Sequence, residues 1–61
     1  MTKWYSAKEI PNPDEWILTK WYDGEDREFK YETDFLYSSE NWKDYAKRNN
    51  ITEWCYIKDV K

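Results

Sequence analysis

The sequence predicts a small α+β domain, an antiparallel sheet of three to four strands with one short helix. Two β-like runs flank Asp23-Gly24, a dipeptide typical of hairpin turns. A later segment has helical spacing, and an apolar run near the C-terminus predicts a further strand. A chain of 61 residues has room for one core, so we expect residues 1–61 to form a single domain.

The first predicted strand spans residues 16–22, where aromatic and β-branched residues occupy both alternating faces. Before it, Ser6-Ala7-Lys8-Glu9 matches a capping box and predicts one helical turn. Asn12-Pro13-Asp14 predicts a turn. We expect Gly24, the only glycine, to occupy a position with positive φ in the hairpin.

The second predicted strand starts at Phe29 and continues to Tyr37, with apolar residues at most odd positions and charged residues at most even ones. The run is long for one strand, and the alternative is a bend or break near Thr33-Asp34 into two strands. This period of two predicts one face in the core and one face in solvent. Together with the flanking strands, it leads to an expected core of Trp16, Leu18, Phe29, Tyr31, Phe35, Trp54 and Tyr56.

A short helix is predicted over residues 40–48, after possible capping residues at 38–41. Trp42, Tyr45 and Ala46 fall at i, i+3 and i+4, the spacing of one helix face. The competing interpretation is a short strand at 42–45 followed by a polar turn. Residues 51–57 predict the last strand, and their apolar character on both faces favours a central position in the sheet.

Residue counts argue against most catalytic and cofactor chemistry. The chain has 0 His and 1 Cys, too few for a Cys/His zinc site or an internal disulfide. With a single Gly there is no glycine-rich phosphate loop, and the acidic turn at 23–26 lacks the spacing of a calcium loop. Cys55 lies in an apolar run, so we expect it to be a small buried residue of the core. We therefore expect no enzyme activity, no metal and no cofactor.

Charge and hydropathy limit the classes of partner and the cellular location that we expect. Ten basic and 13 acidic residues give a net charge of -3, which disfavours nucleic acid. The apolar runs are too short for a membrane span, and the N-terminus lacks the apolar region of a signal peptide. With one reduced cysteine, these features predict a cytoplasmic protein.

Aromatic residues are the most distinctive feature, with 5 Trp, 6 Tyr and 2 Phe, or 21% of the chain. A small sheet cannot bury all of them, and Trp and Tyr are preferred anchors of binding surfaces. Rings near the ends of predicted elements are the candidates for partner contact: Trp4, Tyr5, Trp21, Tyr22 and Trp42. The uncovered side of the first strand is expected to expose Ile17 and Trp21, which predicts either a homodimer or a monomer that binds its partner there.

The order of these landmarks resembles a small uncharacterised family common in phages and prophages. The matching residues are Trp4, Ile10-Pro11, Trp16-Ile17-Leu18, Asp23-Gly24 and Ile51-Thr52-Glu53-Trp54. Glu53 stands where that family often has His. The resemblance implies a small β-rich domain of phage type and no particular activity.

Three functions are consistent with the sequence. The first is a non-catalytic binding module that docks on a host protein in the bacterial cytoplasm, as a counter-defence inhibitor would. The second is a protein that sequesters a nucleotide or another small planar ligand between aromatic rings. The third is a structural or assembly accessory protein.

Overall fold

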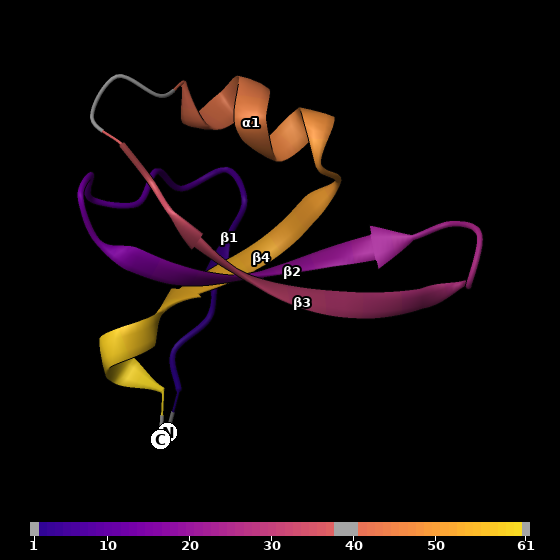
Figure 1. Cartoon of the computed structure of the whole chain (residues 1–61), viewed down its shortest axis with the longest axis horizontal. Helices are drawn as coiled ribbons and strands as arrows, with labels where there is room; N and C mark the ends of the chain where they lie inside the picture. Colours follow the sequence, from indigo (N-terminus) through magenta and orange to yellow (C-terminus); the bar gives the residue numbers. More distant parts are fainter. Residues whose placement is uncertain (1, 38–40, 61) are drawn as a thin grey trace.

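Four antiparallel strands and one helix make up the protein in a computed structural model, which describes residues 2–37 and 41–60 (Figure 1). The sheet has the order β1-β4-β2-β3. This architecture confirms the predicted α+β fold. The elements in chain order are β1 (Tyr5–Ser6), β2 (Trp16–Asp23), β3 (Glu28–Phe35), α1 (Trp42–Arg48), β4 (Ile51–Tyr56) and the 3₁₀ turn η1 (Ile57–Asp59).

The β2–β3 hairpin is in register from Trp16 opposite Phe35 to Asp23 opposite Glu28. Its loop is closed by the Asp23 carboxylate, which accepts hydrogen bonds from the backbone N–H of Glu25 at 2.9 Å and of Asp26 at 3.3 Å. The expectation of positive φ at Gly24 is wrong, because the loop is longer than a two-residue turn. Arg27 adopts the left-handed conformation instead, with φ 54° at the last loop position.

The turn predicted at Ser6-Ala7-Lys8-Glu9 is present as a single hydrogen-bonded turn. The Glu9 N–H donates to the Ser6 carbonyl at 2.9 Å, and the Ser6 hydroxyl accepts from the Lys8 N–H at 3.2 Å. Just before the turn, β1 pairs with β4, with Tyr5 opposite Trp54. The sequence did not predict this two-residue strand. The predicted turn at Asn12-Pro13-Asp14 is present, and Asp14 there has φ 61°.

The helix prediction is confirmed over Trp42–Arg48, and the competing strand at 42–45 is wrong. The Asn41 side chain caps the helix by accepting from the Asp44 N–H at 3.3 Å. Lys47 and Arg48 lie in the last turn, where positive charge is favoured. The other predicted capping residues, 38–40, lie outside the described residues. Figure 1 shows α1 along one side of the sheet.

The main core lies between α1, the N-terminal segment and one face of the sheet. Trp54 is at its centre, 1% exposed, and its indole N–H faces the Ser6 carbonyl at 3.2 Å and the Glu9 carbonyl at 2.9 Å. Tyr5 stacks on Trp54 with ring centroids 4.6 Å apart. The buried apolar residues in this cluster are Ile17, Leu36, Trp42, Ala46, Ile51 and Trp54.

The expected core is wrong for the hairpin. Trp54 is buried, and Leu18, Phe35 and Tyr56 are partly buried, but Trp16, Phe29 and Tyr31 are exposed. Ile17, expected on an uncovered side, is 0% exposed. The physical reason is that α1 and the N-terminal segment pack on the face of β2 that carries Ile17, so the opposite face, with the odd-numbered residues of β3, faces outward.

Candidate binding surface

The sheet has two chemically different faces, and the strand register assigns each residue to one of them. Residues directly opposite each other on paired strands share a face. Ile17 pairs with Tyr56 and Thr19 pairs with Trp54 on the side of α1. Trp16, Leu18, Lys20 and Tyr22 therefore lie on the other side. We call the rings gathered there the aromatic face: Trp4, Trp16, Tyr22, Phe29, Tyr31, Phe35 and Tyr37.

Contacts between rings hold the aromatic face in place. Trp16 and Phe35 are cross-strand partners whose ring centroids lie 5.3 Å apart at 65°. Tyr22 and Phe29 repeat this edge-to-face arrangement at 5.3 Å and 66° near the hairpin loop. Such pairs add about 0.5–1.5 kcal/mol beyond area burial. The rings are thus positioned by their strands and by one another.

The N-terminal segment also contributes to this face. Trp4 immediately precedes the edge strand β1, whereas Tyr31 lies on the opposite edge strand, β3. Their ring centroids are nevertheless 5.9 Å apart. The two side chains therefore reach toward each other across the central strands, where Leu18 and Cys55 pair.

The aromatic face is largely open to solvent. The exposed fraction of each residue is 58% for Trp16, 49% for Phe29, 56% for Tyr31 and 63% for Tyr37, with Tyr22 at 40%. Exposed apolar surface of this kind, gathered in one place, is typical of interaction sites.

The strands give the aromatic face no net charge. Within the four strands, the charged side chains on this side are Lys20 and Glu53, which are directly opposite each other and form an ion pair at 3.5 Å. The Lys20 Nζ also lies 4.6 Å from the centroid of the Phe29 ring. The charged residues of β3 lie on the α1 side: Glu28, Lys30, Glu32 and Asp34.

Of the five residues predicted for partner contact, only Trp4 and Tyr22 lie on the aromatic face. Tyr5 stacks in the core cluster, and Trp21 is partly buried on the α1 side. Trp42 is 3% exposed and donates its indole N–H to the Ala7 carbonyl at 2.9 Å. Its predicted exposure is wrong, because the start of α1 packs on the N-terminal segment.

Sequence reasoning missed five members of the surface: Trp16, Phe29, Tyr31, Phe35 and Tyr37. The period-two pattern of β3 did group most of them on one face. It was interpreted as the core face because apolar residues usually point inward. The pattern alone does not say which face receives the helix.

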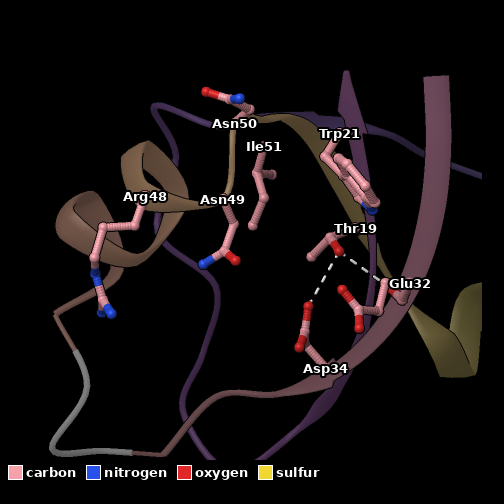
Figure 2. A pocket seen from close by; sticks show the side chains of 8 residues that line it. All are labelled: Thr19, Trp21, Glu32, Asp34, Arg48, Asn49, Asn50 and Ile51. Atoms are coloured by element: carbon pink, nitrogen blue, oxygen red, sulfur yellow. Dashed lines mark hydrogen bonds between the residues drawn. The ribbon is translucent and has the colours of Figure 1, made fainter. Parts of the chain in front are cut away.

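A cavity of about 330 Å³ lies on the opposite side of the sheet, near the end of α1 (Figure 2). Asp34 lines it, but its two carboxylate oxygens accept hydrogen bonds from the Thr19 hydroxyl at 3.1 Å and the Tyr45 hydroxyl at 2.6 Å. Asp34 thereby ties α1 to β2 and β3. The Trp21 indole N–H is buried at the cavity with no hydrogen-bond partner among the described residues. The lining residues are Thr19, Trp21, Glu32, Asp34, Arg48, Asn49, Asn50 and Ile51.

Several other charged groups form surface pairs. Lys30 contacts Asp23 at 2.8 Å and Asp26 at 2.6 Å, and the hydrogen bond from Lys30 is the main cause of a lowered pKa at Asp23. Lys58 contacts Glu15 at 2.7 Å and lowers the pKa of that carboxyl. The first pair bridges the two strands at the hairpin loop, and the second joins η1 to the residue before β2.

Reactive and metal-binding groups are scarce in the parts of the chain that the structure describes. Cys55 is fully buried, and burial raises the pKa of its thiol, which opposes a nucleophilic role. Within residues 2–37 and 41–60, no three His, Cys, Asp or Glu side chains are grouped to hold a metal ion. No helix in the same ranges is long and apolar enough to cross a membrane.

Comparison with protein-family models, curated proteins and solved structures finds no match to this chain.

Proposed function

We propose that this protein is a non-catalytic binding module that docks on another protein through the aromatic face. The observation that supports this function is the exposure of five rings, 40–63% each, on one neutral side of the sheet. Trp and Tyr are enriched among residues that dominate binding energy, because they bury a large area with few rotatable bonds.

The aromatic face also suits binding because it is built on regular structure. Most of its rings project from two eight-residue strands in continuous register. Rings held this way lose little conformational entropy when a partner arrives. A neutral, apolar surface favours a partner with an uncharged apolar patch over nucleic acid, whose phosphates require net positive charge.

The resemblance to a phage and prophage family supports a bacterial host protein as the partner. On this proposal the module acts in the host cytoplasm as a counter-defence inhibitor, by covering a surface of the host protein. The proposal requires no catalytic group, metal or cofactor.

Affinity capture with matched variants tests the docking function. The wild-type chain should retain a stoichiometric protein from bacterial lysate, and the double variant Trp16→Ser/Tyr31→Ser should lose it. Ile10→Ser is the control, because Ile10 is 63% exposed but lies in the N-terminal segment that packs against Trp54. Equal capture by all three chains, or no stoichiometric partner from several hosts, would reject the proposal.

A second candidate function is the sequestration of a small planar ligand in the cavity of Figure 2. The Trp21 indole ring lines this cavity and offers a flat apolar surface on which a planar ligand can stack. Glu32 and Asp34 bring two carboxylates to the same cavity, and its basic lining residue, Arg48, is paired with Asp44, so phosphates are disfavoured. Thermal melting with a panel of nucleobases, nucleosides and cyclic dinucleotides tests it, since a ligand at 100 times its Kd adds ~2.7 kcal/mol. Unchanged melting curves would eliminate this candidate.

A further inference from the structure

The aromatic face is self-complementary in charge. The chain has a net charge of -3, but the four strands place only the paired Lys20 and Glu53 on this side. Two copies that met through it would therefore bring no unpaired like charges of the strands into contact. A strongly charged partner would find no matching charge on the same surface.

The exposed area is also sufficient for an interface between two copies. Large aromatic side chains bury roughly 150–250 Å² each. Five rings at about half exposure therefore present on the order of 500 Å² per copy. A symmetric pair that buried all of it would remove about 1,000 Å² from water, the size that a specific interface must reach. Leu18 and Phe35, which are partly buried, add to this area.

A second copy would supply the apolar layer that the chain lacks on this side. In the structure, α1 packs on the other face of the sheet (Figure 1), and the buried apolar cluster among the described residues has six members. A domain of this size hides only ~60% of the surface of its unfolded chain, so additional burial contributes a large share of its stability. Sheets pack face to face at a separation of about 10 Å, which leaves room for interdigitating rings.

We infer that two copies of this chain form a two-fold symmetric dimer in which the aromatic faces pack on each other. The inference shares its surface with the proposed function, because a host protein would replace the second copy on the same rings. It makes partner binding and self-association mutually exclusive.

Sedimentation velocity from low micromolar to near-millimolar protein tests the dimer. The wild-type chain should pass from monomer to dimer over this range. Trp16→Ser/Tyr31→Ser should weaken dimerisation by about tenfold or more, as loss of hot-spot rings does. Ile10→Ser should dimerise like wild type.

A charge-matched pair gives an independent readout. Lys20→Glu places two carboxylates next to each other on the aromatic face, whereas Lys43→Glu makes the same change in net charge on the exposed side of α1. Only Lys20→Glu should weaken the dimer. Circular dichroism of each variant identifies any that fail to fold, and the wild-type result stands without them.

Two results would overturn the inference. One is a wild-type chain that stays monomeric at every concentration, which leaves docking on a host protein intact. The other is a dimer that the aromatic variants do not weaken, as expected if the edges of β3 paired instead. Conversely, a dimer that weakens as described, combined with capture that ignores the aromatic variants, would reject the proposed function and not the dimer.

Discussion

Trp16 and Ile17 are consecutive residues of β2 with opposite environments: Trp16 is 58% exposed on the aromatic face, and Ile17 is fully buried under α1. Ile17→Ala should lower the free energy of unfolding by about 2–5 kcal/mol, because it leaves a void in the core. Trp16→Ala, which loses mainly its contact with Phe35, should cost about 1 kcal/mol or less. Urea unfolding at a concentration where the wild type is monomeric measures both. Equal losses would contradict the assignment of the two faces.

The Trp54 indole is predicted to fasten the N-terminal segment to the sheet. Trp54→Phe removes the donor that faces the Ser6 and Glu9 carbonyls and should cost about 1–3 kcal/mol. Hydrogen exchange should accelerate at the Ala7 N–H, which bonds to the Thr52 carbonyl, more than at amides of the β2–β3 hairpin. Trp16→Phe serves as the control and should leave Ala7 protected. Uniform acceleration across the chain would argue against a local fastening role.

Cys55 should be inert in the folded protein. Its side chain is fully buried, and burial raises the pKa of the thiol, so both access and thiolate are lacking. A chromogenic disulfide reagent should label it only in denaturant, and the slow native rate should follow global unfolding. Labelling at the rate of a free thiol would show that the central strands are accessible.

The Asp23–Lys30 pair predicts that the free energy of unfolding depends on pH in the acid range. The hydrogen bond from Lys30 lowers the pKa of Asp23 below its ordinary value of 3.8. The stabilisation is therefore complete above that value and is lost as the pH falls through the lowered pKa of the folded protein. Carboxyl NMR titration should show the low pKa directly. Asp23→Asn keeps an oxygen that accepts from the Glu25 N–H but removes the carboxylate charge. The variant should therefore be less stable than wild type at neutral pH and equally stable at a pH where Asp23 is protonated.

Local elements of the fold were predictable because their signals are local. The run at 16–22 and the following Asp-Gly predicted β2 and the turn after it, and Asn41 with Trp42 and Ala46 predicted α1. The two-residue strand β1 was missed, since Tyr5 and Ser6 become a strand only by pairing with β4.

The orientation of the sheet was not predictable from a period of two. Both faces of the hairpin include aromatic residues, and the helix can pack on either. Lys30 and Asp34 lie on the α1 side without a large burial cost because partners satisfy them: Asp23 and Asp26 for Lys30, and Thr19 and Tyr45 for Asp34. In Figure 1 the hairpin also extends beyond the end of α1, so part of that face stays hydrated.

The candidate surface was only partly predictable for the same reason. Of the residues selected by their position near the end of an element, Trp4 and Tyr22 lie on the aromatic face, whereas Trp42 is buried. The buried Trp42 indole donates to the carbonyl of Ala7, which is 35 residues away in sequence. Only the tertiary structure reveals such a contact.

The most direct test of the aromatic face is NMR of the five tryptophan indole N–H groups as the protein concentration rises. Trp42 and Trp54 donate to backbone carbonyls in the core and should keep constant shifts and slow solvent exchange. The indoles of Trp16 and Trp4 should shift and become protected from solvent as the aromatic faces meet. Concentration-dependent shifts at the core or α1-side indoles, with Trp16 unchanged and solvent-exposed throughout, would contradict the account.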